Sequence, residues 1–187
     1  MHQFIKRMIL RNSVNAALQR ASVYDGSADV QLKREFKEKA KQWLVAFGNR
    51  YSWGKASKKN WCKEIQSLAK TLTEEFGNYL TGKRLRIGVS QKMISLYLKY
   101  LWLCGEDDKK PLFAVLDRRI MKVASVKNPP NWTELDKIDE YKRIGCEINK
   151  FAKSKINKKT KKYYSDGAEW EAKEWNDEVD EDDFSIL

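Results

Sequence analysis

The sequence contains a single histidine, His2, which stands beside the N-terminus. This excludes Ser–His–Asp and Cys–His catalysis, the zinc site of the deaminases and most other metal centres that depend on histidine. The only cysteines, Cys62, Cys104 and Cys146, are widely spaced and odd in number. Such spacing favours reduced thiols over a disulfide framework, and it offers no four-cysteine cluster for an iron–sulfur centre. We therefore expect chemistry carried by carboxylates, lysines or backbone groups, with no metal and no organic cofactor.

Long apolar runs are also missing. No run approaches the ~18 residues that a membrane-spanning helix requires. The N-terminal stretch "MHQFIKRMILRNS" is too short and too polar to be a secretory signal. We expect an intracellular, cytoplasmic protein that is not secreted and has no membrane partner.

Acidic residues are scarce in most of the chain and concentrated at its end. The net charge is +11, but ten acids and one lysine lie between residue 166 and the C-terminus, so residues 1–165 carry +20. Apolar residues make up 42% of the 187 residues, which is typical of a folded domain. A folded body of this charge suits an anionic partner, with nucleic acid first and an anionic membrane second. A merely solvated lysine surface is the structural alternative.

The apolar residues recur at helical spacing, and only three prolines interrupt the chain. This periodicity predicts helices at residues 30–47, 58–80 and 133–153, with N-caps at Ser27 or Asp29, at Ser57 and at Thr133, respectively. Residues 90–104 are apolar on almost every side, so we expect that helix in the middle of the fold. Shorter helices are expected after Asp117 and around "AEWEAKEW".

No alternating strand pattern occurs, and we predict an all-α, compact helical domain. Residues 1–165 form the basic domain in this interpretation, and residues 166–176 form a helix that packs on it. Residues 177–187 are then an acidic, disordered tail. We expect a monomer.

A glycine-containing turn, Gly88-Val89-Ser90, separates a basic segment from the start of the apolar helix. Such a turn exposes backbone N–H groups at a helix N-terminus, where a phosphate can bind. It is also common before helices of no special function. The residues predicted to contact DNA are those of the turn and its flanks: Lys83, Arg84, Arg86, Gly88, Val89, Ser90 and Gln91.

Asp117 is a carboxylate inside the apolar stretch "PLFAVLDRRIMKVA". Its simplest role is to cap the helix that follows. Its alternative role is catalytic, because a carboxylate stabilises positive charge that develops on a sugar when its glycosidic bond breaks. The two roles are compatible.

The Gly88 turn with its flanks and the stretch around Asp117 together resemble the helix-hairpin-helix DNA glycosylase superfamily over residues 83–124. "GVSQK" is similar to the family's hairpin, which reads roughly G-V-G-x-K: Gly88 and Val89 match, Ser90 stands at the second glycine, and Lys92 falls on the lysine. "LFAVLDRRI" resembles the family's V-D-x-H-[VI]-x-R segment, with Asp117 on the aspartate.

The resemblance implies an enzyme that flips a damaged or modified base out of double-stranded DNA and cleaves its N-glycosidic bond. Asp117 would stabilise the sugar cation, and Lys92 is the candidate nucleophile for an additional AP-lyase activity. Leu96 and Trp170 are candidates for the base pocket. Each has a structural alternative: Lys92 as a phosphate contact or exposed helix residue, and Leu96 and Trp170 as core. A substrate in modified phage DNA, excised as a defence, is one form of this function.

Two other classes remain open at this point. One is a non-enzymatic helix-hairpin-helix module that binds DNA through the Gly88 turn. The other is an RNA-binding or membrane-surface protein that relies on "KFAKSKINKKTKKYY", which places seven lysines between residues 150 and 162. That stretch is either a DNA-contacting helix end or loop, or a solvated linker.

Overall fold

The computed structural model describes residues 1–176, and this part of the chain contains helices, two isolated bridges and no β-strand. The predicted all-α class is therefore confirmed. The α-helices are α1 (Gln3–Leu18), α2 (Val30–Arg50), α3 (Lys58–Phe76), α4 (Ile87–Leu103), α5 (Arg118–Val123), α6 (Ile138–Lys153) and α7 (Gly167–Asn176). The short 3-10 helices are η1 (Trp53–Lys55), η2 (Gly77–Tyr79), η3 (Thr81–Lys83) and η4 (Asp107–Lys109). The acidic tail expected at 177–187 lies outside the described residues.

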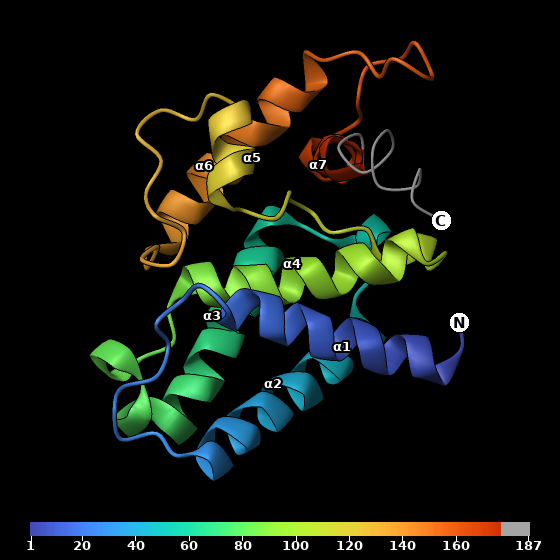
Figure 1. The fold of residues 1–187 in the computed structure, drawn as a ribbon. Helices are drawn as coiled ribbons and strands as arrows, with labels where there is room; N and C mark the ends of the chain where they lie inside the picture. Colours follow the sequence, from blue (N-terminus) through green and yellow to red (C-terminus); the bar gives the residue numbers. More distant parts are fainter. Residues whose placement is uncertain (177–187) are drawn as a thin grey trace, which may run out of the picture.

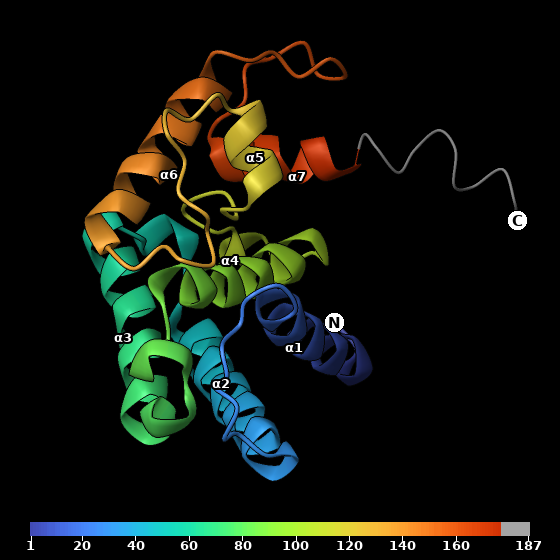
Figure 2. The ribbon, with the colours of Figure 1, turned by 60° about the vertical axis from the view of Figure 1, so that its left-hand side comes forward.

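Helix α4 runs through the middle of the molecule. Both views place α1 and α2 on one side of it and α5, α6 and α7 on the other, while α3 runs past α4 and reaches α6 (Figures 1 and 2). Met93, Ile94 and Leu98 of α4 are fully buried. A helix that is apolar all round gains most when it is covered on every side, and this accounts for its central position.

Helices α2 and α3 follow the predicted periodicity and caps. The Asp29 side chain accepts a hydrogen bond from the Leu32 backbone N–H, and Ser57 accepts one from Asn60. Both caps satisfy backbone donors that a helix start leaves unpaired. The apolar stripe of each helix contributes fully buried residues to the core, including Phe36, Leu44, Ile65, Leu68 and Leu72.

Four elements differ from the sequence-based expectation. Helix α3 ends at Phe76 and not at residue 80, and α4 begins at Ile87, so the predicted turn Gly88-Val89-Ser90 is the first turn of this helix. The other two are α1 and α6. The N-terminal stretch forms the full helix α1, whose Val14 and Ala17 are fully buried. Helix α6 begins at Ile138, and Lys137 rather than Thr133 is its N-cap residue. Trp132 and Leu135, which precede α6, are buried, and the Leu135 carbonyl accepts a hydrogen bond from Gly88 at the start of α4. Residues 133–137, which periodicity assigned to the helix, are therefore non-helical, because the neighbouring residues form a tertiary contact with α4.

The described helices include none that is both long and apolar enough to cross a membrane. Cys62 is buried, Cys104 is exposed and Cys146 is half-buried, and all three are free thiols. The prediction of unpaired cysteines is confirmed.

Candidate active site

Lys92, Leu96 and Asp117 line one pocket of about 350 Å³. The pocket lies where the end of α1, one face of α4, the segment before α5 and one side of α7 meet. Its volume falls in the lower part of the range for small-molecule sites. The remaining lining residues are Ala16, Gln19, Arg20, Lys99, Tyr100, Leu103, Val115 and Glu171. The structure therefore brings together three residues that the sequence singled out.

Gln91 explains how two segments 25 residues apart meet at this pocket. Its side-chain Nε2 donates to the Leu116 carbonyl at 3.0 Å, and its Oε1 accepts from the Leu116 N–H at 3.3 Å. The residue before Lys92 is thus bonded twice to the residue before Asp117. Gln91 is fully buried, which corrects its predicted role as a DNA contact. It holds the two candidate catalytic segments together.

Asp117 is half-buried and caps α5. Its Oδ1 accepts a hydrogen bond of 3.0 Å from the Ile120 N–H. The backbone before it is held by Val115 and Leu116, both of which are almost fully buried. The cap orients the carboxylate, so the confirmed capping role and a place at the pocket occur together.

Lys92 is half-buried, and its ammonium lies 4.1 Å from the centre of the Trp132 ring. Burial lowers the pKa of Lys92 because it disfavours the charged form. Nearby Asp117 opposes that shift, and the positive charge of Arg20 at the end of α1 adds to it. Arg20 was missed because it is 72 positions away in the chain.

A buried ion pair forms one wall of the pocket. Lys99 Nζ lies 2.6 Å from Glu171 Oε1, and the two residues are 6% and 0% exposed. Burial raises the pKa of Glu171, and the charge of Lys99 opposes that shift. We did not predict this pair from the sequence. Its signal was the spacing of Lys92 and Lys99, seven residues apart in an otherwise apolar helix, which places both on one face.

The Gly88 turn is closed to a ligand. The Gly88 N–H donates to the Leu135 carbonyl at 2.8 Å, and the N–H groups of Val89 and Ser90 donate to the Arg86 carbonyl. All three residues of the turn are buried. A Cβ atom at Gly88 would lie 1.7 Å from the Trp132 carbonyl oxygen, so the chain passes directly over this glycine. The predicted phosphate contacts through Gly88, Val89 and Ser90 are corrected accordingly.

The basic residues before the turn help to hold that covering segment. Arg84 forms an ion pair with Asp136, and the Arg86 guanidinium donates to the Glu134 carbonyl at 3.2 Å. Lys83 is exposed. Of the three basic residues predicted to contact DNA, Arg84 and Arg86 therefore have a structural partner in the chain.

Trp170 is a core residue. It is 1% exposed, packs edge-on against Phe151 with 5.1 Å between ring centres, and donates through Nε1 to Glu174. It does not line the pocket, which corrects its assignment to the base site. Leu96 does line the pocket, one turn of α4 after Lys92.

Comparisons with protein-family models, with curated proteins and with solved structures found no match for this chain. Among residues 1–176, no group of three or more His, Cys, Asp or Glu side chains is placed to hold a metal ion.

Proposed function

We propose that this protein is a DNA glycosylase, which cleaves the N-glycosidic bond of a damaged or modified base flipped into the pocket. The observation that supports it is the convergence of a carboxylate, Asp117, and a partly desolvated amine, Lys92, on one pocket of about 350 Å³. The apolar side chains of Leu96 and Val115 also line that pocket and suit the face of a base.

Each group has a defined part in the proposed reaction. When the bond between C1′ and the base nitrogen breaks, the electron pair leaves with the base, and the base takes a proton from solvent. Positive charge develops on the sugar, where the Asp117 carboxylate stabilises it. The Lys92 amine then forms a bond to C1′ and releases a proton to water. Opening of the sugar ring, with a proton taken up from water by O4′, gives a Schiff base. Loss of a C2′ proton to water then expels the 3′ phosphate and cleaves the strand.

A burial-lowered pKa supports this role for Lys92, because only the unprotonated amine attacks.

The competing hypothesis is a non-enzymatic module that binds phosphates through the backbone N–H groups of the Gly88 turn. Those groups are not available to a phosphate. The N–H groups of that turn are bonded within the chain.

The direct test uses Asp117→Asn with a panel of duplexes that carry modified bases, including the modified bases of phage DNA. We expect the release of free base to fall by a factor of about 10² or more, while binding to the same duplex persists. Asparagine retains a cap acceptor, so stability should change by only a few tenths of a kcal/mol.

Asp139→Asn is the matched control. Asp139 is an exposed acid in the first turn of α6, so this variant removes the same charge at another helix start. It should excise at the wild-type rate. If Asp117→Asn excised the base as fast as the wild type, the proposed mechanism would be wrong. Release of no base from any duplex by the wild type would remove support for the activity itself.

A further inference from the structure

The lysine-rich stretch between α6 and α7 folds into an ordered hairpin. The Asn157 N–H donates to the Lys162 carbonyl at 2.8 Å, the Tyr164 N–H donates to the Lys155 carbonyl at 3.2 Å, and Ile156 bridges to Tyr163. At the tip, the Asn157 side chain accepts hydrogen bonds from the N–H groups of Lys159 and Thr160. We call residues 155–164 the basic hairpin. Of the lysine-rich stretch 150–164, the residues up to Lys153 are therefore the end of α6, and the rest is an ordered loop and not a structureless linker.

The basic hairpin carries positive charge that no ion pair within residues 1–176 neutralises. Its five lysines are all exposed, and none has an ion pair with any residue from 1 to 176. Elsewhere many basic side chains do have an acidic partner, as Arg84 has Asp136 and Arg50 has Glu64. The lysines are Lys155, Lys158, Lys159, Lys161 and Lys162.

Two apolar side chains accompany this charge. Ile156 is 52% exposed and Tyr163 is 65% exposed, and the bridge places them opposite each other. Between them the tip contains only lysines, Asn157 and Thr160. A membrane-surface element needs a continuous apolar face, which this hairpin does not have. An exposed tyrosine among lysines instead suits a sugar–phosphate chain, where the ring packs on sugars or bases and the lysines contact phosphates.

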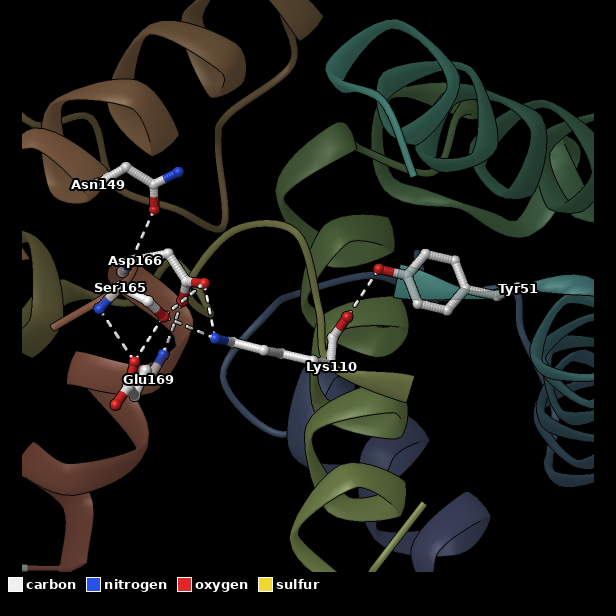
Figure 3. Close-up of polar contacts among 7 residues, drawn as sticks. Tyr51, Lys110, Asn149, Ser165, Asp166 and Glu169 are labelled. Carbon is white, nitrogen blue, oxygen red and sulfur yellow. Dashed lines mark hydrogen bonds and ion pairs between the residues drawn. The ribbon is translucent and has the colours of Figure 1, made fainter. Parts of the chain in front are cut away.

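The base of the hairpin is firmly anchored (Figure 3). Lys110 Nζ lies 2.6 Å from Asp166 Oδ2 and donates to Ser165 Oγ at 3.0 Å, directly after the hairpin. Ser165 in turn donates through its backbone N–H to Glu169 of α7. The Lys110 carbonyl accepts a hydrogen bond from Tyr51, which ties the cluster to the end of α2. A rigid base limits the entropy that the hairpin would lose on binding.

The hairpin stands at the end of the molecule beyond α7, opposite α2 in both views (Figures 1 and 2). It leads directly into α7, which supplies Glu171 to the pocket. Helix α7 therefore links the hairpin to one wall of the pocket.

We propose that the basic hairpin is a clamp for the sugar–phosphate backbone of a DNA duplex, separate from the pocket. The choice of DNA rests on the proposed glycosylase function. The clamp supplies the phosphate contacts that were predicted for the Gly88 turn, whose N–H groups are hydrogen-bonded within the chain.

The test measures binding of the full-length protein to an unmodified duplex by fluorescence anisotropy over a series of salt concentrations. Replacing Lys158, Lys159, Lys161 and Lys162 together by Gln should make the slope of log K against log salt shallower by about 3 to 4, at roughly 0.9 per lost phosphate contact. Tyr163→Ala should weaken binding without changing that slope, because it removes no charge.

The matched control replaces Lys55, Lys58, Lys59 and Lys63 by Gln. These lysines are exposed in and around η1 and the start of α3, and their loss removes the same formal charge. The control should lower the slope by less than about 1. Equal slopes for the two quadruple variants, or a hairpin variant that binds as the wild type does, would overturn the clamp. So would lysine-dependent binding to vesicles of anionic lipid in the absence of duplex binding.

The clamp and the glycosylase fail in different experiments. A shallower salt slope for the hairpin variant, together with no release of base from any duplex by the wild type, would support the clamp and remove support for the glycosylase. Base release that is sensitive to Asp117→Asn, with binding that does not depend on the hairpin, would do the reverse.

Discussion

At the scale of single residues, Asp117 and Lys92 are each held by contacts that also serve the fold. The cap hydrogen bond from Ile120 orients the Asp117 carboxylate. The Trp132 ring contacts the Lys92 ammonium, and the neighbouring Gln91 is locked onto Leu116. Groups that are already oriented need little reorganisation as charge develops in the transition state. The same contacts therefore serve both stability and the proposed chemistry.

The lowered pKa of Lys92 makes a prediction about pH. Borohydride trapping of a Schiff base on a substrate duplex should rise with pH, with a midpoint below the ordinary lysine value of about 10.4. Arg20→Gln removes a positive charge that lowers this pKa, so the midpoint should move upward and the trapped fraction at neutral pH should fall. Lys122→Gln, which removes an exposed cation from α5, should leave the midpoint unchanged.

The lowered pKa of Lys92 also determines how this residue makes stability depend on pH. Folding weakens proton binding by Lys92, so the contribution of this group to stability grows as pH rises from the folded pKa towards the unfolded one.

In the trapping experiment, loss of the borohydride adduct in Lys92→Gln would identify the reacting amine. A midpoint at the ordinary lysine value, or one insensitive to Arg20→Gln, would contradict this account of the site.

At the scale of elements, the start of α4 is a packing contact. The segment before α6 crosses Gly88 so closely that the Leu135 carbonyl accepts the Gly88 N–H, which was predicted to bind a phosphate. Arg84 and Arg86 keep that segment in place through Asp136 and Glu134. A helix N-terminus can be satisfied by another part of the same chain as well as by an anion.

Gly88→Ala tests this packing. The added methyl group would overlap the Trp132 carbonyl, so we expect a loss of about 1–3 kcal/mol in the free energy of unfolding, measured with urea. Gly54→Ala is the control, because no atom lies within 4 Å of the Cβ it would add. A Gly88→Ala protein of unchanged stability that no longer bound DNA would instead restore the phosphate-binding role of the turn.

At the scale of the whole molecule, the pocket depends on the contact between the two sides of α4. Lys99 belongs to α4 and Glu171 to α7, so their ion pair fixes the last described helix against the central one. Gln91 fixes the segment before α5 in the same way. The pocket therefore exists only when α4 is covered from both sides.

A double-mutant cycle measures the ion pair. Lys99→Met leaves the Glu171 carboxylate buried without its cation, and it should cost about 3–5 kcal/mol of unfolding free energy. Adding Glu171→Leu should recover much of that loss, because no uncompensated charge then remains. Strictly additive effects would show that the two side chains do not interact.

Lys70→Met is the exposed comparison. Lys70 and Glu74 lie 3.6 Å apart on the surface of α3, one turn from each other. This variant should change stability by less than about 1 kcal/mol, because water screens an exposed pair.

Local patterns in the amino-acid sequence were enough to predict the helical class, the central position of α4, the caps at Asp29 and Ser57, and the capping role of Asp117. These depend on neighbours within one or two turns, so spacing and side-chain type decide them. The resemblance over residues 83–124 also singled out Lys92, Leu96 and Asp117, which the fold brings to one pocket.

Tertiary structure alone decided which groups surround that pocket and which surfaces stay open. Arg20, Gln91 and the Lys99–Glu171 pair act on segments distant in the chain, while the buried Gly88 turn and Trp170 lost the roles that the sequence indicated. Periodicity shows which face of a helix is apolar, but it does not show which distant segment will cover it. Only the folded chain determines whether a backbone N–H meets a carbonyl group or is left for a phosphate.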